Sequence, residues 1–376
     1  MSSSERNNST VAAAEVDWKL KHLTSTRDGI SSAIEKINDI EDFSDSRAAS
    51  EEEYSQAREN LLRLAKAIDL EATKFAVGVL AASKEDQCTA LCRDFRKPVE
   101  MFADAIRGVS TFTRTKTLRA CIRREGNYLL HASLALAGHA VDAANRGESK
   151  TDPAKAGHVF ECCKKLRTNL PKSDKIAVKR AVLKSTLEIK DTADEFAESL
   201  KGHVEDSFVG DEMFEEDEMT DDERETVSAA VRILRRCQRL CKASAAAMTS
   251  LSVSPSKGVS GVLDRVVATT TEIAARVVDV GCALYTPIEG EGCVAVLENV
   301  GKILKAVDCL QKDLLLLPPL SAPEQRNAVI KICDGIREAR TLLKACKLLQ
   351  HGDGDNGDGK APTTTNGGAS KEAPRE

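Results

Sequence analysis

Aromatic residues are scarce in this sequence, at 3% of 376 positions with a single tryptophan. Strand-rich sandwiches rely on aromatic and β-branched residues, so this scarcity disfavours a β fold. Alanine, leucine, lysine, glutamate and valine dominate instead. Hydrophobic residues make up 41% of the chain and charged residues 30%, which is typical of a globular protein. The composition favours helices packed through aliphatic side chains.

Motifs for catalysis or phosphate binding are also missing. The sequence contains no GxxxxGK[ST] or GxGxxG loop, no GxSxG elbow and no HExxH pair. The net charge of −5 disfavours broad binding to nucleic acids or anionic membranes. We therefore expect a protein without enzymatic activity, catalytic residues or cofactor.

Twelve cysteines raise the question of a metal site or a disulfide framework. No CxxC occurs, and no cysteine pair is followed by a histidine pair at zinc-finger spacing. Three pairs at i, i+4 spacing could each supply half of a metal site: His158/Cys162, Cys88/Cys92 and Cys237/Cys241. Because no further ligand pair is evident, we interpret them as residues of the hydrophobic core. Free buried thiols are typical of a reducing compartment. The polar start MSSSERNNST predicts no signal peptide, and no apolar run approaches the ~20 residues of a membrane span. We expect a cytosolic or nuclear protein without bound metal.

Apolar residues recur at helical spacing along most of the chain. The clearest segment is 259–284, where Val262, Val266 and Ile273 follow the i, i+3/i+4 pattern. Proline- and glycine-containing stretches such as SPSKG and YTPIEGEG separate the segments. The predicted helices lie at 16–37, 51–83, 85–108, 117–147, 154–169, 174–202, 221–252, 259–284, 290–316 and 323–350. This pattern predicts an all-α fold of two antiparallel helical bundles.

An acidic run interrupts the helical pattern. EDSFVGDEMFEEDEMTDDERE, at 205–225, holds twelve acidic residues against one arginine. Repulsion between like charges keeps such a segment extended. We therefore predict an acidic linker at 205–219, between an N-terminal bundle at 12–204 and a C-terminal bundle at 220–350, with disordered ends at 1–11 and 351–376. Thr220, followed three residues later by Glu223, predicts a capping box that begins the next helix.

Two charged segments are candidate interaction sites. Basic side chains recur every three or four positions along the predicted helix 221–252. They form either a stripe that binds an acidic partner or an ordinary solvated helix face. The stripe comprises Arg232, Arg235, Arg236, Arg239 and Lys242. The acidic run contains apolar residues among its acidic ones, a composition typical of a segment that binds a partner. The alternative is a plain linker. The acidic interaction segment comprises Phe208, Asp211, Glu212, Phe214, Glu215, Glu216 and Asp217.

A second basic cluster opens the predicted helix at 117–147. It comprises Arg114, Lys116, Arg119, Arg123 and Arg124. Nucleic-acid binding would normally add aromatic side chains for stacking and glycines for close approach. Because neither accompanies the cluster, nucleic acid is a disfavoured partner.

Four blocks carry a resemblance to a known family. They are NLPKSDKIAVKRAVLKSTLEIKDTADEF (169–196), TLRACIRREGNYLL (117–130), TDDERETVSAAVRILRRCQRLCKASAAAM (220–248) and DVGCALYTPIEGEGCVAVLENVGKILKAV (279–307). The first block has Leu170-Pro171, a short polar turn, Lys175, and a helix ending in Lys190-Asp191, with Thr192 inserted before Ala193. This layout resembles the cyclin-D-binding protein family, also called GCIP (Grap and cyclin-D interacting protein).

The resemblance implies an all-helical protein without enzymatic activity, with bundles similar to those of vinculin and alpha-catenin. It implies binding to D-type cyclins and to helix-loop-helix regulators, and restraint of cell-cycle progression from cytoplasm and nucleus. The chain departs from the family's description as lacking a basic region, because its predicted helix 221–252 is basic. A cytoskeletal adaptor of the vinculin or alpha-catenin type is the alternative function, and a metal-dependent enzyme is a third. A homodimer is compatible with either binding function.

Overall fold

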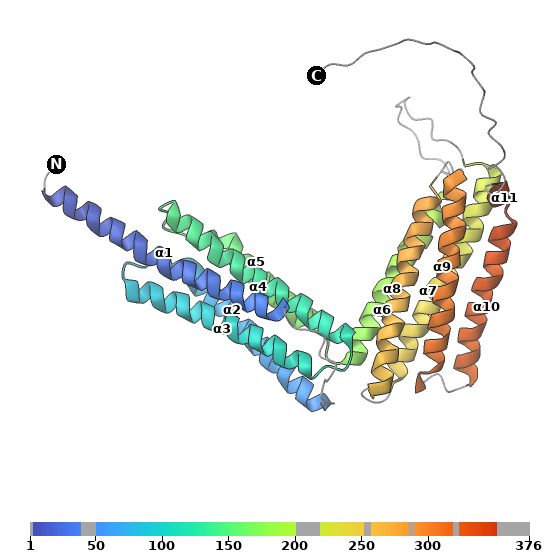
Figure 1. Ribbon diagram of the computed structural model, residues 1–376, viewed down its shortest axis with the longest axis horizontal. Helices are drawn as coiled ribbons and strands as arrows, with labels where there is room; N and C mark the ends of the chain where they lie inside the picture. The colour runs from blue at the N-terminus through green and yellow to red at the C-terminus, as the bar shows by residue number, and fades with distance from the viewer. Residues whose placement is uncertain are drawn as a thin grey trace, which may run out of the picture.

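All regular elements in the described part of the chain are helices, which confirms the predicted all-α fold class. The computed structural model describes residues 3–38, 50–200, 219–251, 257–285, 288, 290–318 and 323–351. Figure 1 labels the helices: α1 (Ser3–Asn38), α2 (Glu51–Gly78), α3 (Glu85–Thr111), α4 (Lys116–Asn145), α5 (Pro153–Asn169), α6 (Asp174–Ser199), α7 (Asp221–Ser250), α8 (Lys257–Ala283), α9 (Gly290–Leu315), α10 (Pro323–Ala345) and α11 (Lys347–His351).

Local sequence signals explain several helix ends. The predicted capping box at the start of α7 is confirmed, because the Glu223 backbone N–H donates to the Thr220 hydroxyl (3.3 Å) and the Thr220 N–H donates to the Glu223 carboxylate (2.8 Å). α4 is followed by Gly147, at which the predicted helix 117–147 also ends, and its φ of 70° lies in the left-handed region that only glycine adopts readily. The N–H of Gly147 donates to the Ala144 carbonyl, and the next N–H reaches back one residue further.

The capping carboxylate of α7 makes one further long-range bond. Glu223 is buried and accepts a hydrogen bond from the backbone N–H of Ile288, just before α9 (2.9 Å). Burial opposes ionisation of this carboxyl, but the N–H donors of Ile288 and Thr220 outweigh burial and lower its pKa. The carboxylate therefore fastens the start of α7 to the segment that leads into α9.

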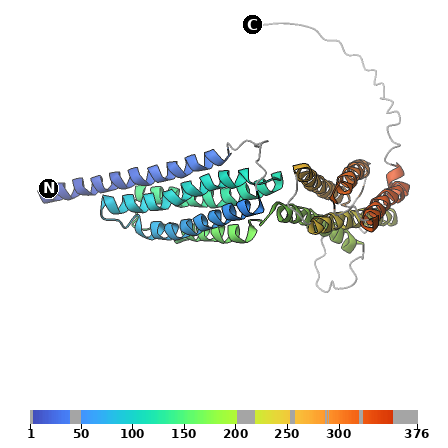
Figure 2. The same cartoon turned by 90° about the horizontal axis from the view of Figure 1, so that it is seen from below.

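The buried side chains form two separate hydrophobic cores. The first core unites α1–α5, and its Phe75 and Phe95 rings stack with centroids 4.7 Å apart. The second core unites α6–α11, where α6 packs against α7 and α8. Figures 1 and 2 show the corresponding two groups of helices, which meet near the α5–α6 turn with their axes inclined to one another.

The boundary between the cores differs from the predicted boundary. The predicted N-terminal bundle extends to residue 204, but α6 buries Val178, Val182 and Ile189 in the second core. The chain passes from one core to the other in the first turn of α6, because Ala177 still packs in the first core and Val178 in the second. The acidic run marked a break in the hydrophobic pattern, whereas packing against α7 and α8 decides which core α6 joins. Residues 205–218 of the predicted linker and 352–376 of the predicted tail lie outside the described residues.

The first helix begins earlier than predicted. α1 runs from Ser3, although residues 1–11 were expected to be disordered. Its Ala12–Ala14 stretch consists of the strongest helix former, which favours extension of the helix toward the N-terminus.

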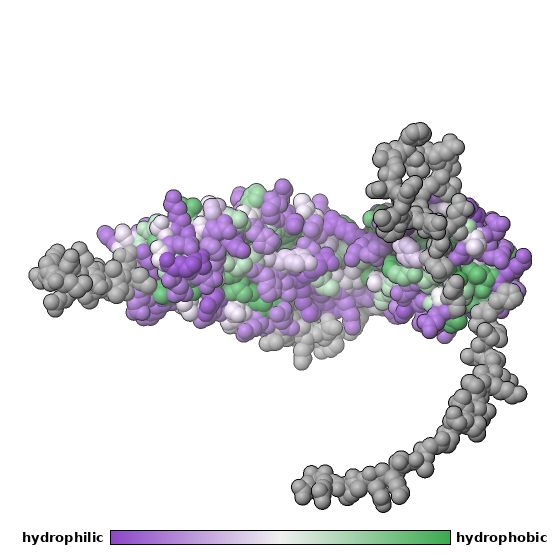
Figure 3. All heavy atoms as spheres, turned by 90° about the horizontal axis from the view of Figure 1, so that it is seen from above, coloured by the Kyte–Doolittle hydropathy of each residue, from purple (hydrophilic) through white to green (hydrophobic). Residues whose placement is uncertain are grey.

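The surface view shows no extended apolar face. In Figure 3 hydrophilic residues predominate on the visible side, and hydrophobic residues form scattered patches between them. Over the described residues, no helix combines the length and hydropathy that a membrane crossing requires.

Candidate functional site

The turn between α5 and α6 is held against the first core. Leu170 and Pro171 are buried there. The Tyr54 hydroxyl of α2 donates to the Pro171 carbonyl (2.8 Å), and the Arg58 guanidinium donates to the Leu170 carbonyl (3.1 Å). Burial raises the pKa of Tyr54, so its hydroxyl keeps the donated proton. These bonds fix the point from which α6 leaves the first core.

Two carboxylates of the second core cap the N-terminus of α4. Asp174, the first residue of α6, accepts from the backbone N–H (2.8 Å) and hydroxyl (2.6 Å) of Thr115. Asp264 of α8 accepts from the backbone N–H groups of Lys116 (2.8 Å) and Thr117 (3.1 Å), and from the Thr117 hydroxyl (2.8 Å). Negative charge at a helix N-terminus satisfies otherwise unpaired N–H groups and complements the helix dipole. The caps therefore tie α4 to the second core.

Burial also affects the ionisation of Asp174. Desolvation raises the pKa of Asp174, against the hydrogen bonds from Thr115 and Arg114 that favour its ionised form. The neighbouring charge of Asp264 raises the pKa further.

A groove runs beside this junction, between α4 and α5. Its first hollow, of about 590 Å³, is lined by Tyr128, His131 and Ala135 of α4 and by His158, Cys162 and Lys165 of α5. A second hollow, of about 470 Å³, is lined by α6 residues that include Ala177, Arg180, Ala181 and Lys184. The two hollows adjoin, because both are lined by Arg124 and Asn169, and together they are called the α4–α5–α6 groove.

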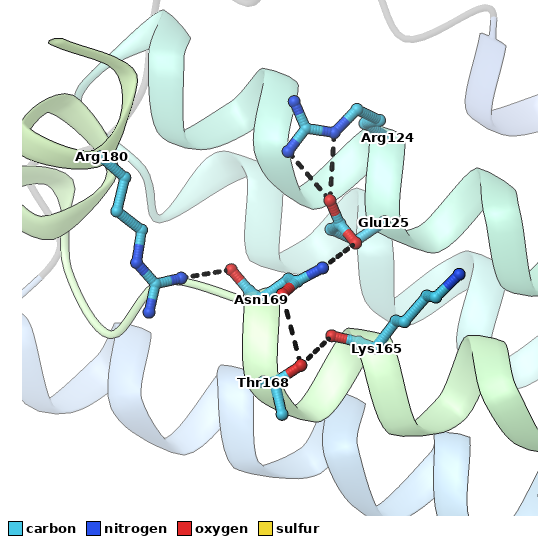
Figure 4. Close-up of polar contacts among 6 residues, drawn as sticks. All are labelled: Arg124, Glu125, Lys165, Thr168, Asn169 and Arg180. Carbon is cyan, nitrogen blue, oxygen red and sulfur yellow. Dashed lines mark hydrogen bonds and ion pairs between the residues drawn. The ribbon is translucent and has the colours of Figure 1, made fainter. Parts of the chain in front are cut away.

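Hydrogen bonds between Arg124, Glu125, Asn169 and Arg180 bridge the middle of the groove (Figure 4). The Glu125 carboxylate, whose side chain is only 6% exposed, accepts from Arg124 (2.9 and 3.0 Å) and from the Asn169 amide (3.3 Å). Arg180 donates to the backbone carbonyl of Asn169 (2.7 Å), the last residue of α5. A cation at this position complements the negative end of the α5 dipole.

The balance of charge along the groove is positive. Arg124, Lys165, Arg180 and Lys184 bring four cationic side chains to it from three helices. Its two carboxylates already have cationic partners: Glu125 pairs with Arg124, and Glu188 lies 3.6 Å from Lys184. The groove therefore presents unneutralised positive charge to anything that approaches it.

The predicted basic stripe on α7 divides between two neighbouring helices. Arg232, Arg239 and Lys242 are exposed. Arg235 is directed toward Asp194 of α6, at 3.5 Å. Arg236 packs instead against Gly335 of α10. Figure 1 shows α7 between α6 and α10, the two helices that Arg235 and Arg236 approach.

The α7–α10 side of the stripe is mixed in charge. Arg236 and Arg239 line a hollow of about 660 Å³ together with Lys331, Asp334 and Glu338 of α10. Carboxylates in the same hollow offset the arginines. The predicted acidic interaction segment at 208–217 lies outside the described residues.

The cysteine and histidine pairs singled out in the sequence do not form a metal site. Within the residues that the structure describes, no three His, Cys, Asp or Glu side chains come together in a metal-binding cluster. The Cys162 sulfur lies 4.0 Å from the His158 Nε2 at the groove wall. The pairs Cys88/Cys92 and Cys237/Cys241 are buried free thiols. Burial raises the pKa of Cys241 to about 12, which keeps that sulfur protonated.

Most of the groove was not singled out by sequence reasoning. Arg124, His158 and Cys162 were noted individually, but Lys165, Asn169, Arg180 and Lys184 were not. On α5 the spacing of His158, Cys162, Lys165 and Asn169 follows i, i+4, i+7, i+11, which places them on one helix face. That spacing was a usable signal, although it does not reveal which helices lie opposite.

Together these features define an all-α protein with two hydrophobic cores and a cationic groove at their junction. Residues 60–202 match the family model described as Grap2 and cyclin-D-interacting, N-terminal. The match confirms the predicted resemblance over that segment. It runs from within α2 to just beyond the end of α6 and contains every groove residue except Thr271 of α8. No curated protein and no solved structure matches the chain.

Proposed function

We propose that this protein is a non-enzymatic regulatory binding protein that acts on D-type cyclins and helix-loop-helix regulators, in cytoplasm and nucleus. The observation that carries the proposal is the family match over residues 60–202, because the family's description names cyclin D and Grap2 as what its members interact with. Binding such partners would restrain cell-cycle progression and transcription.

The arrangement of the matched segment supports a binding function. Helical bundles commonly recognise partners by receiving a partner helix in a groove between their own helices. The α4–α5–α6 groove is open, cationic and formed almost entirely by the matched segment. The exposed arginines and lysine of the α7 stripe lie outside that segment and are a secondary candidate surface.

Binding can be tested directly with the full chain and purified partners. We expect a D-type cyclin, or a helix-loop-helix regulator, to bind in an isothermal titration, whereas a cyclin of another class serves as the matched control. The full chain used as bait in a cell lysate should recover the same partners. Absence of binding by both partner classes would contradict the proposal. Co-sedimentation with actin filaments in their place would favour the vinculin- or alpha-catenin-type adaptor.

A further inference from the structure

We propose that the α4–α5–α6 groove binds an acidic amphipathic helix of a partner protein. The inference rests on the proposed function, because it assigns to the binding protein one surface and one chemistry of partner. It is carried by the dimensions of the groove, its charge and the side chains that form its walls.

The dimensions suit a short helix. Along α4 the groove extends from Cys121 to Ala135, and fourteen residues of helix rise about 21 Å. A partner helix laid parallel to α4 would therefore engage over about four turns. The two hollows, of about 590 and 470 Å³, accept side chains from such a helix rather than a whole globular surface.

The walls combine small side chains with one aromatic ring. Ala135 of α4 is exposed and Ala181 of α6 is half-buried, so both small side chains leave room beside the backbone. Tyr128 stands at the groove with 57% of its surface exposed. Aromatic residues with an exposed apolar face are favoured anchors in protein interfaces. The apolar face of a partner helix can thus pack on Tyr128 and between the alanines.

The charge selects acidic residues for the other face of the partner helix. Arg180 and Lys184 lie one helical turn apart on α6, and Lys165 lies across the groove on α5. The groove also holds two carboxylates, but the buried Glu125 is bonded to Arg124 and Asn169 and Glu188 lies 3.6 Å from Lys184, so the cations remain in excess. The α7–α10 hollow has a smaller excess of cations, with Arg236, Arg239 and Lys331 against Asp334 and Glu338.

The test measures binding of two designed peptides to the full chain by fluorescence anisotropy. The probe is a labelled helical peptide of about 16 residues, with leucines along one face and glutamates along the other. In its matched control, lysines replace the glutamates. We expect the acidic peptide to bind, the lysine peptide not to bind, and the affinity to fall between about 50 and about 300 mM salt, since exposed charges are screened.

Two variants locate the binding surface. Arg180→Glu with Lys184→Glu is expected to weaken binding by about tenfold or more, because two attractive contacts become repulsive. Lys305→Glu with Lys312→Glu, at exposed positions of α9, makes the same change in net charge away from the groove and should leave the affinity unchanged. Ala135→Trp fills the groove at an exposed position without changing any charge, and it should also abolish binding. Circular dichroism confirms that each variant is folded.

The outcomes separate this inference from the proposed function. Equal binding of both peptides, or equal weakening by the α9 variant, would overturn the groove assignment. Peptide binding that appears only after deletion of residues 207–217 would also overturn it, because the chain's own acidic segment would then be the occupant of the groove. Loss of self-association in the Arg180/Lys184 variant would assign the groove to a second copy of the chain. Cyclin binding that survives both groove variants overturns the inference and leaves the function standing. Peptide binding without cyclin binding overturns the proposed function and leaves the groove assignment standing.

Discussion

Replacing Asp264 by alanine should destabilise the first core, although Asp264 belongs to the second. The carboxylate accepts three hydrogen bonds at the N-terminus of α4, from the N–H groups of Lys116 and Thr117 and from the Thr117 hydroxyl. Alanine leaves these donors without their partner and removes the negative charge that complements the helix dipole. α4 contributes buried leucines and alanines to the first core, so fraying of its first turn weakens that core.

The expected loss is about 1–2 kcal/mol. Loss of a capping side chain generally costs about 0.5–2 kcal/mol. The value for Asp264 is placed in the upper part of this range because its carboxylate serves two N–H groups and a hydroxyl. It is not the sum of three charged hydrogen bonds, because Lys116 is exposed and water can replace the lost acceptor there.

The single tryptophan makes the effect measurable in the first core alone. Trp18 of α1 packs against that core, so its fluorescence reports unfolding of α1–α5, whereas far-ultraviolet circular dichroism reports all helices. With a urea dependence of about 2 kcal/mol per molar, the tryptophan transition of Asp264→Ala should move to lower urea by about 0.5–1 M.

Two variants control the interpretation. Asp264→Asn keeps one acceptor oxygen and should lose less than the alanine variant. Asp279→Ala removes another α8 carboxylate, one that pairs only with the partly exposed Arg276 of its own helix, and should change little. A tryptophan transition that is unchanged in Asp264→Ala would refute the idea that the second core supports the first through this cap.

Three further predictions concern other parts of the chain. Gly126→Ala should lower the free energy of unfolding, measured by thermal melting, by about 1–3 kcal/mol, because the added methyl group overlaps Ile106 of α3. In the matched control Gly138→Ala, the methyl group meets open space and should raise the free energy of unfolding by up to about 1 kcal/mol. Glu223→Gln should flatten the acid limb of stability below the ordinary carboxyl pKa of about 4.3. Because the pKa of Glu223 is lowered in the folded protein, its contribution is present above that ordinary value and is lost as pH falls through the folded value. In pulse alkylation followed by mass spectrometry, the exposed Cys282 and Cys309 should be modified first; earlier modification of any buried thiol would contradict the described burial.

Features that depend on neighbouring residues were predictable from the sequence. Thr220 and Glu223 lie three positions apart, and their capping box marks the start of α7 without reference to the rest of the fold. Gly147 follows the end of α4 because the local chain there needs a positive φ. Helix positions followed in the same way from the apolar period.

Features that depend on distant packing were not predictable. The apolar stripe of Val178, Val182 and Ile189 fits either core equally well as a pattern, and only contact with α7 and α8 assigns it to the second. The groove joins side chains from three helices, and its charge balance depends on Glu125 being bonded to Arg124 and Asn169. A single sequence fixes the face on which each residue lies but not the helix opposite.

The junction and the groove use the same helices. α4 carries the N–H groups capped from the second core and also the groove residue Arg124, while α6 carries the capping Asp174 and the groove residues Arg180 and Lys184. A helix bound in the groove therefore contacts both cores, and its affinity depends on how they are placed. A ligand shifts an equilibrium only through a difference in affinity between the states. Because the Asp174 and Asp264 caps hold the arrangement in which Arg124, Arg180 and Lys184 converge, occupancy of the groove and formation of the caps stabilise one and the same orientation of the two cores.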